Sequence, residues 1–421
     1  MSGSSSSSSG STKKEGQKYG EIRNTIDLDV LNDYLKKNVK GIAAPVTAKQ
    51  FSFGQSNPTY ILTDSDASKY VLRKKPPGTL LSPTAHAVER EYRVLKALGE
   101  HNERLPGDKG TGPHDDQRLK HRDAVPVPKV YTLCEDASIL GTPWYIMQFV
   151  EGRIFEDPRM VTIPKQERIQ CYESALKTLA ALHRIKPADV GLESYGKTQD
   201  FYMRQLKGLG KVSYMQSKAK DKDTGKEVGE IPSFKDITTW FAKNMVADEN
   251  GITHGDYKID NLIFHPTEPR VIGVLDWELS TLGHPLSDLG NILQPFSLDC
   301  PDPSIASAPL DQLQKSGSGK SEDMFMSLGG LDKSTCPVPT KEQNLEIYCQ
   351  AVERPFPIPN WAFCEAWAWF RLAVIAQGIA ARVAQKQASS AEAVRYASKF
   401  PACAENVKLI IRRSEEGKAK L

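Results

Sequence analysis

Two short stretches of this chain contain polar residues at a spacing suited to phosphoryl transfer. Residues 253–261 read THGDYKIDN and residues 274–277 read VLDW. Asp256 can take the proton of an attacking hydroxyl, because a carboxylate is ionised at neutral pH. Asn261 and Asp276 offer the hard oxygen ligands that Mg²⁺ prefers, and they can hold this cation on a triphosphate. The spacing therefore predicts ATP and Mg²⁺ as cofactors.

Three neighbours of these residues allow more than one interpretation. His254 is a catalytic candidate, but we favour a buried, hydrogen-bonded histidine that braces the loop. Lys258 stands two residues after Asp256, where a cation stabilises a transferring phosphoryl group, or it is an ordinary exposed lysine. For Asp260 we favour a capping or loop role. Taken singly, Asn261 could be an ordinary turn-capping residue and Asp276 an ordinary residue at the end of a strand. Only the spacing of the two together favours Mg²⁺.

Short alternating apolar runs predict a strand-rich lobe at residues 27–149, which is expected to bind the nucleotide. Helical spacing of apolar residues occurs near residue 28 and again at 85–98. A polar, glycine-rich stretch at 99–123 is expected to be a surface loop. The predicted strands are 47–53, 59–63, 69–73, 130–133 and 144–149.

The pattern becomes mainly helical in a second predicted lobe at residues 150–413. The stretch 253–261 falls on a loop between short strands, and Asp276 follows the strand 271–275. We therefore expect an α+β, two-lobed fold with a small antiparallel-sheet N-lobe and a mainly helical C-lobe. The predicted helices are 164–183, 201–216, 234–250, 342–352, 361–387 and 391–413.

Three polar segments are expected to lie outside the packed lobes. Residues 1–20 are rich in Ser and Gly and are predicted to be disordered, residues 299–340 to form a long insertion, and residues 414–421 to form a flexible tail. The tail ends in Ala419-Lys420-Leu421, which resembles the Ser-Lys-Leu peroxisomal address. This predicts a peroxisomal import receptor as partner. The alternative is a solvated lysine-rich tail and a cytoplasmic location.

Composition argues against several other classes of protein. The net charge of +3 over 421 residues gives no sign of a nucleic-acid binder. Seven cysteines without a C-x-x-C pair predict free thiols and no zinc site. The most apolar stretch, 361–381, contains Glu365, Arg371 and Gln377, so it is not expected to span a membrane. No secretory signal pattern opens the chain.

Four further segments, taken with the two polar stretches, indicate a family. They are FGQSNPTY at 53–60, YVLRKKPPG at 70–78, HAVERE at 86–91 and LDWELSTLG at 275–283. With them, the chain resembles the aminoglycoside phosphotransferase and choline kinase group of the protein-kinase-like fold. The closest resemblance is to the kinase-like domain at the N-terminus of the larger acyl-CoA dehydrogenase family members, here expected in a stand-alone form.

The resemblance implies where the nucleotide binds. The turn at Gly54 would cover the phosphates with backbone N–H groups, although the full G-x-G-x-x-G pattern is missing. Arg73 stands where kinases usually have Lys, and would pair with Glu91; Arg keeps the charge but not the geometry of Lys. The segment joining the lobes would receive the adenine. The residues assigned to the nucleotide are Gly54, Ser56, Asn57, Arg73, Glu91, Met147 and Phe149.

Two residues after the second polar stretch are also given roles by the resemblance. Asp288 is expected to accept backbone N–H groups and steady the catalytic loop. His284 stands where many relatives have an acid, and we interpret it as a local change at the surface.

The resulting hypothesis is an ATP- and Mg²⁺-dependent small-molecule kinase. The resemblance and the peroxisomal address together favour the hydroxyl of a 4-hydroxyacyl-CoA or a related hydroxy acid as acceptor. One alternative is an amino-alcohol or aminoglycoside kinase. The C-terminal helices have few acids beyond Glu353 and Glu365 to bind such cations, which argues against it. The other alternative is a pseudokinase that binds nucleotide or acyl-CoA without turnover.

Overall fold

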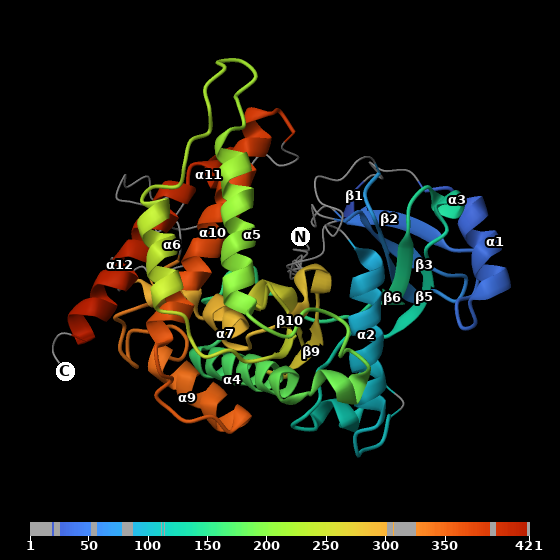
Figure 1. Ribbon diagram of the computed structural model, residues 1–421. Coiled ribbons are helices and arrows are strands. Elements are labelled where there is room, and N and C mark those ends of the chain that lie inside the picture. The colour runs from blue at the N-terminus through green and yellow to red at the C-terminus, as the bar shows by residue number, and fades with distance from the viewer. Residues whose placement is uncertain are drawn as a thin grey trace, which may run out of the picture.

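The computed structural model describes residues 19–20, 26–51, 57–77, 87–110, 112, 114–300, 306, 326–387 and 393–418. Two lobes lie side by side, one built on an antiparallel sheet and the other mostly helical (Figure 1). This confirms the predicted α+β class and its two-lobed organisation. The predicted nucleotide residues Gly54 and Ser56, most of the segment 299–340 and the tripeptide 419–421 lie outside the described residues.

The N-lobe sheet has the strand order β1-β2-β3-β4-β6-β5, and all neighbouring strands in it are antiparallel. The short β1 pairs with β2, so the predicted disorder of the N-terminal segment does not extend to residues 19 and 20. The strands are β1 Tyr19–Gly20, β2 Thr47–Phe51, β3 Thr59–Thr63, β4 Lys69–Lys74, β5 Val130–Cys134 and β6 Trp144–Gln148.

The two faces of this sheet are covered by different helices because side chains alternate along a strand. Leu72 belongs to the apolar cluster that includes Leu31 and Leu35 of α1 (Leu28–Asn38). Its neighbour Val71 belongs to the larger cluster that includes α2 (Val88–Glu103) and the C-lobe. Arg73 shares the face of Val71, and this alternation directs its side chain toward α2 and the C-lobe.

The ends of the N-lobe helices follow local signals in the sequence. Asp27 caps α1 by accepting from the N–H groups of residues 29 and 30, and the following helix α2 continues through Glu103. Residues 99–103 are therefore helical, and the predicted surface loop is shorter than expected. Gly99 tolerates the helix at a modest cost in free energy. Two short helices complete this lobe, η1 Gln117–Lys120 and α3 Ala137–Leu140.

The C-lobe is built from helices around two small antiparallel ladders. Its last predicted helix is two helices, and the second continues through Lys418 into the segment expected to be a flexible tail; the helix predicted at 234–250 ends at Lys243. The helices are α4 Lys165–Arg184, α5 Phe201–Ser217, α6 Phe234–Lys243, α7 Leu286–Ile292, α9 Lys341–Val352, α10 Trp361–Ala384, α11 Ala393–Ala397 and α12 Phe400–Lys418. The short 3₁₀ turns are η2 Pro187–Val190, η3 Ile259–Asn261, η4 Trp277–Leu279 and η5 Gln294–Ser297.

Helix α10 is the centre of the C-lobe and packs against α5, α7, α11 and α12. Trp367, Trp369 and Phe370 are fully buried on it, as expected of a helix that is apolar on most sides. Within the described residues, no helix has the length and hydropathy that a membrane crossing needs. All seven cysteines are free, as predicted.

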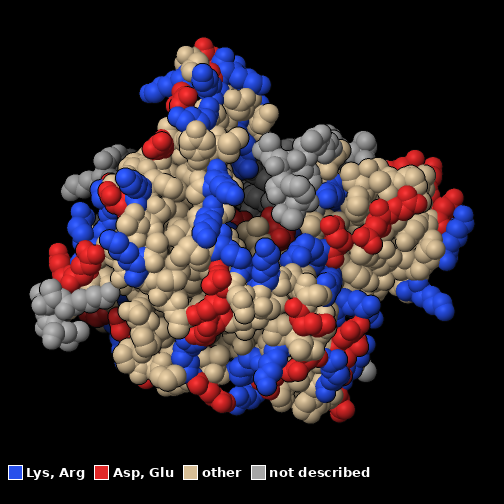
Figure 2. Space-filling view, viewed as in Figure 1, with Lys and Arg blue, Asp and Glu red and all other residues tan. Residues whose placement is uncertain are grey.

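Charged side chains are mixed over the viewed surface, and the loop after α5 projects furthest from it (Figure 2). This loop contains Lys218, Lys220, Lys222 and Lys226 together with acids. The same view shows the surface hollowed between the two lobes. The absence of a single basic face in this view agrees with the charge balance of the sequence.

The segment that links the lobes is joined to the catalytic region at Gly152. The neighbouring Arg153 exchanges two backbone hydrogen bonds with Phe264, at 2.7 and 2.8 Å. A Cβ on Gly152 would lie 2.4 Å from the Phe264 carbonyl oxygen and 2.5 Å from a methyl carbon of Ile263. Both neighbours are fixed in a strand, so neither can move away cheaply.

We predict that Gly152→Ala lowers the free energy of unfolding by about 1–3 kcal/mol, because the added methyl group overpacks this junction. Urea denaturation measures the change. Gly208→Ala is the matched control: Gly208 lies inside α5 with open space around it, so Ala should be neutral or raise stability by up to about 1 kcal/mol. Equal stability of the two variants would contradict the proposed role of Gly152.

Candidate active site

Two strand pairs bring the two polar stretches of the sequence together. β7 (Gly251–Thr253) pairs with β10 (Thr281–Gly283), and β8 (Leu262–Phe264) pairs with β9 (Val271–Val274). The N–H of Leu275 donates to the carbonyl of Asn261 at 2.9 Å. Because Asp276 follows Leu275 directly, this bond places the two predicted metal ligands next to each other.

A buried carboxylate holds the start of the loop at residues 253–261, called the catalytic loop below. Asp288 on α7 is fully buried and accepts from the N–H of His254 at 2.7 Å and from the N–H of Gly255 at 2.8 Å. Burial opposes its charge, but hydrogen bonds from His183 and from the backbone of His254 hold the pKa of Asp288 below its ordinary value. The expected role of Asp288 is confirmed.

Gly255 adopts a conformation that few other residues could adopt here. Its φ is +85°, and a Cβ would lie 2.5 Å from the carbonyl oxygen of Leu279. Both facts require glycine, which pays no steric penalty at positive φ. The loop can therefore turn sharply between the two N–H groups that donate to Asp288 and the side chain of Asp256.

His254 braces the loop from inside. It is fully buried, its Nε2 lies 2.7 Å from the carbonyl oxygen of Leu275, and the N–H of Asp256 donates to its Nδ1 at 3.2 Å. Its ring packs on Trp277, with centroids 4.6 Å apart. These contacts join the two polar stretches, which is the bracing role that we favoured for this residue over direct participation in the reaction.

The carboxylate of Asp256 is oriented by two amides. Asn261 donates to its Oδ2 at 3.1 Å and Asn291, from α7, donates to its Oδ1 at 3.4 Å. Asn261 also donates to the backbone carbonyl of Asp256 at 2.8 Å. The side chain of Asp256 is only partly buried. It is therefore held in place and open to a ligand, as a general base must be.

The oxygen atoms of Asn261 and Asp276 fit a Mg²⁺ ion. Since the NH₂ group of Asn261 is used on Asp256, its carbonyl oxygen is the atom left for a cation. Asp276 is held at a positive φ of 65° at the end of the short loop after β9. No cluster of three His, Cys, Asp or Glu suited to a metal occurs among the described residues. A pair of oxygen ligands suits a cation that also binds phosphates and water.

Lys258 lies between two carboxylates. Its Nζ is 3.5 Å from Asp256 and 3.2 Å from Asp260. Burial opposes its charge, but these two carboxylates outweigh it and raise the pKa of Lys258. Of the two roles expected for Asp260, the loop role fits: it lies inside the short turn η3 and pairs with Lys258, whereas the N-cap position of that turn is Lys258. The cation is present at the site, and its effect on phosphoryl transfer stays a prediction.

Arg73 links the N-lobe to the catalytic region. It donates to Glu91 on α2 at 2.8 Å, which is the predicted pair, and to Asp276 at 2.6 Å. Burial opposes its charge, but the carboxylates of Glu91 and Asp276 outweigh it and raise the pKa of Arg73. In turn, burial opposes the charge of Asp276, and Arg73 lowers the pKa of that carboxyl below its ordinary value. The arginine that replaces the usual lysine therefore still supplies the positive charge and still pairs with Glu91.

Glu278 is a residue of this cluster that the sequence analysis missed. Its carboxylate lies 3.7 Å from Arg73, and Asn57 donates to it at 3.3 Å. Asn57 is fully buried and is the one predicted residue of the phosphate-covering turn that the structure describes. Glu278 could have been identified from the sequence, because it stands two residues after Asp276 in one of the segments typical of the family.

The two residues predicted at the adenine differ in position. Met147 lies inside β6, paired with Val71 on one side and Val130 on the other. Its backbone is paired within the sheet, and the assignment of Met147 to the adenine stays a prediction. Phe149 follows the end of β6 at Gln148 and lies where the chain passes between the lobes.

His284 is not at the surface, contrary to the expectation. It is 1% exposed, and its Nε2 lies 3.1 Å from the carbonyl oxygen of Ala247. Burial lowers its pKa, and the ring packs in the core beside Tyr202. Sequence patterns around His284 could not indicate its burial, because the Ala247 carbonyl that it contacts belongs to a segment distant in the chain.

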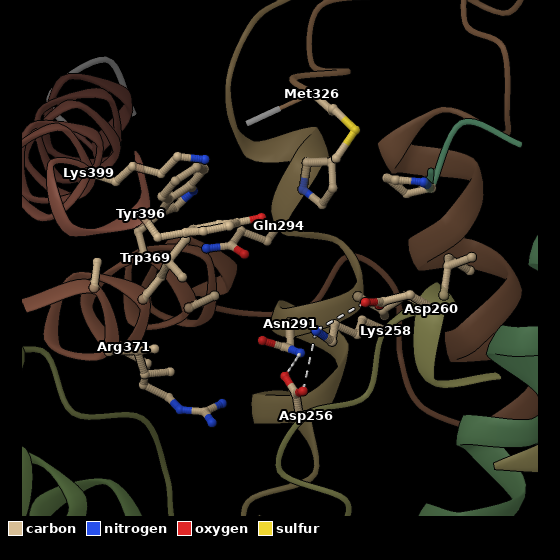
Figure 3. A pocket seen from close by; sticks show the side chains of 18 of the residues that line it. Asp256, Lys258, Asp260, Asn291, Gln294, Met326, Trp369, Arg371, Tyr396 and Lys399 are labelled. Carbon is tan, nitrogen blue, oxygen red and sulfur yellow. Dashed lines mark hydrogen bonds and ion pairs between the residues drawn. The ribbon is translucent and has the colours of Figure 1, made fainter. Parts of the chain in front are cut away.

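A cavity of about 320 Å³ opens beside Asp256 on the C-lobe side (Figure 3). One wall is the catalytic loop with Asp256, Lys258 and Asp260, and the opposite wall belongs mainly to α10. The side chains on that wall and at its edges are mostly apolar or cationic. They are Ala368, Trp369, Arg371, Leu372, Ile375, Ala376 and Ile379 of α10, with Tyr396 and Lys399 from the α11 region.

Sequence reasoning also missed Arg371, as it missed Asn291. It donates from Nη2 to the carbonyl oxygen of Gly255 at 2.6 Å, and its guanidinium points toward Asp256 (Figure 3). The sequence analysis used Arg371 only as a charge that argues against a membrane-spanning helix. Its place in a strongly apolar helix was the signal, because a charge among tryptophans needs a partner.

Comparison with known proteins agrees with this geometry. Residues 47–308 match the model of the family described as the phosphotransferase enzyme family. The solved structure of a Ralstonia eutropha protein, a candidate aminoglycoside phosphotransferase, is similar with a TM-score of 0.70 and 32% identity. The similarity covers 92% of this chain and 99% of that one.

Two curated relatives are longer proteins. The Arabidopsis thaliana protein IBR3, named a probable acyl-CoA dehydrogenase, is 36% identical over 88% of this chain and 40% of its own length. The Rattus norvegicus acyl-CoA dehydrogenase family member 11 is 34% identical over 92% of this chain and 44% of its own length. The chain thus spans less than half of these relatives. The match over most of the chain and the arrangement of the site lead to one conclusion: it belongs to the phosphotransferase enzyme family and is a small-molecule kinase.

Proposed function

We propose that this kinase transfers the γ-phosphoryl group of ATP, with Mg²⁺, to a hydroxyl of a 4-hydroxyacyl-CoA or a related hydroxy acid. The relatives named as acyl-CoA dehydrogenases support an acyl acceptor, because such enzymes act on acyl-CoA compounds. The acceptor cavity gives independent support from the residues of this chain.

The observation on which this proposal rests is the chemistry of the cavity beside Asp256. Its described acids are Glu156, Asp256 and Asp260, and the last two already face Lys258. The opposite wall is apolar and adds two cations, Arg371 and Lys399. Such a cavity suits a ligand with a hydrocarbon part and an electron-rich group.

Each of the residues around the site has a separate role in the proposed reaction. Asp256, oriented by Asn261 and Asn291, receives the proton of the attacking hydroxyl. Arg73 and Lys258 place positive charge where the phosphoryl group passes, which stabilises the transition state electrostatically. Asn261 and Asp276 would hold Mg²⁺, which supplies charge neutralisation on the phosphates when bound.

The alternative of an amino-alcohol or aminoglycoside acceptor finds less support. A polycationic acceptor calls for a surplus of acids around the hydroxyl. The two acids of the C-terminal helices considered for this role lie elsewhere: Glu365 is buried against Lys341, and Glu353 pairs with Arg122 at the surface. Neither lines the cavity.

The direct test mixes the purified protein with ATP, Mg²⁺ and a panel of acceptors, and detects phosphorylated products by mass spectrometry. We expect product from 4-hydroxyacyl-CoA or the free hydroxy acid, and none from amino alcohols or aminoglycosides. Intact ATP binding without any acyl product would refute this acceptor class. ATP hydrolysis alone decides nothing, because water is a poor acceptor that many kinases use.

We predict that Asp256→Asn lowers kcat by about 10²–10⁴-fold, because the amide cannot accept the hydroxyl proton. ATP affinity and the melting temperature should change little. Asp260→Asn is the matched control, since Asp260 also pairs with Lys258 but does not face the acceptor hydroxyl in this scheme. Full activity of the Asp256 variant would remove this residue from the role of base.

We predict that Asp276→Asn raises the Mg²⁺ concentration needed for half-maximal ATP binding by about tenfold or more, since loss of a charged ligand costs at least about 1.4 kcal/mol. Asn can still accept from Arg73, so the link between the lobes should survive. Titration of nucleotide binding against Mg²⁺ measures the shift, and binding without Mg²⁺ serves as the reference. An unchanged Mg²⁺ requirement would show that Asp276 is not a metal ligand.

A further inference from the structure

Apolar residues recur at helical spacing along the side of α10 that lines the cavity. Ala368, Leu372, Ile375 and Ile379 recur at intervals of three and four residues, so they lie along one side of the helix. From Leu372 to Ile379 this stripe is about 10 Å long, roughly the extent of an eight-carbon chain. Helix α10 therefore presents an apolar track that begins beside the catalytic loop and leads away from it.

Part of this track is open to the cavity although the helix around it is buried: Leu372 and Ile379 are half-buried, Ile375 is exposed, and only Ala368 is fully buried. Ile375 is 46% exposed, and Tyr396, which also lines the cavity, is likewise 46% exposed. The residues on the other sides of α10, such as Ala373 and Val374, are buried in the core. Large apolar side chains left open inside a cavity favour a hydrocarbon ligand, because such a ligand removes them from water.

Arg371 stands where this track meets the catalytic loop. One of its N–H groups donates to Gly255, whose carbonyl group is bonded directly to Asp256. A guanidinium has five N–H donors. Within the described part of the chain, this is the one hydrogen bond that Arg371 makes. Its remaining donors thus lie beside Asp256, at the head of the apolar track (Figure 3).

Lys399 is the other cation on the α10 side of the cavity, but it is directed differently. It is 7% exposed, and its Nζ lies 4.3 Å from the centroid of the Tyr396 ring. A cation over an aromatic face is already stabilised there. Arg371 is therefore the better placed of the two to meet a polar group on an acceptor whose hydroxyl lies at Asp256.

We propose that Arg371 binds the acyl oxygen of the acceptor while the α10 track takes its hydrocarbon tail. This inference rests on the proposed function and deepens it. Two fixed points, Arg371 for the acyl oxygen and Asp256 for the hydroxyl, select an acceptor whose hydroxyl stands a few bonds from its acyl carbon. The bond to Gly255 couples recognition to catalysis, because the same guanidinium holds the peptide that precedes the base.

The test compares acceptors within each variant. The panel contains a 4-hydroxyacyl-CoA, the free 4-hydroxy acid and an alcohol of equal length that lacks an acyl oxygen. We expect Arg371→Gln to lower kcat/KM for the two acyl acceptors by about ten- to a hundredfold more than for the alcohol, chiefly through KM. Arg371→Lys should recover part of this difference. Arg382→Gln, an exposed position on the same helix outside the cavity, should change neither.

The outcomes separate the possible roles. An equal loss for all three acceptors would show that Arg371 only supports the loop, and would overturn the inference. A difference confined to the CoA ester or to the free acid identifies which acyl group Arg371 binds, and supports it. If the unmodified enzyme phosphorylates no acyl acceptor at all, the proposed function fails, which is a distinguishable result.

The track itself is tested by chain length. Ile379→Trp should block its far end, so activity on a five-carbon acceptor should persist while activity on a twelve-carbon acceptor falls about tenfold or more. Val394→Trp is the control, because Val394 is exposed on α11 but does not line the cavity. Equal loss for both chain lengths in the Ile379 variant would place the tail elsewhere.

Discussion

The structure depends first on one buried carboxylate. Asp288 lies in a core without access to water, where an unpaired charge would cost several kcal/mol, and the two N–H groups at His254 and Gly255 satisfy it. The N–H groups depend on Asp288 in turn, since the sharp turn at Gly255 leaves them without another backbone acceptor among the described residues. Asp256, the proposed base, follows this turn directly. Its position is thus fixed by the electrostatics of the core.

The second constraint acts between the lobes. Arg73 is contributed by a strand of the N-lobe sheet, yet its charge is balanced by Glu91 of α2 and by Asp276 of the C-lobe. A buried guanidinium requires both partners, so the lobes cannot separate without exposing or unpairing it. The carboxylate that pairs with Arg73 is also a proposed metal ligand. Nucleotide and metal would therefore bind where the two lobes already meet.

The third feature is the division of α10 into a buried and an open side. Its tryptophans and small residues fill the core, which fixes the helix rigidly. The remaining side, with Arg371 at one end and Ile379 toward the other, faces the cavity. A site on a rigid helix holds its ligand more accurately than a site on a loop. Specificity in this kinase would then come from a helix that is otherwise structural.

The sequence by itself identified the candidate reacting groups, because Asp256, Asn261 and Asp276 are local in the chain and their spacing is set by short strands and turns. It also determined the two-lobed class and the Arg73–Glu91 pair, which follow from strand alternation and from the resemblance to kinases. Only the tertiary structure decided the contacts between distant segments: Arg371 on Gly255, Asn291 on Asp256, Glu278 beside Arg73 and the burial of His284. Such contacts depend on how helices pack, and periodicity within one segment contains no information about its neighbour.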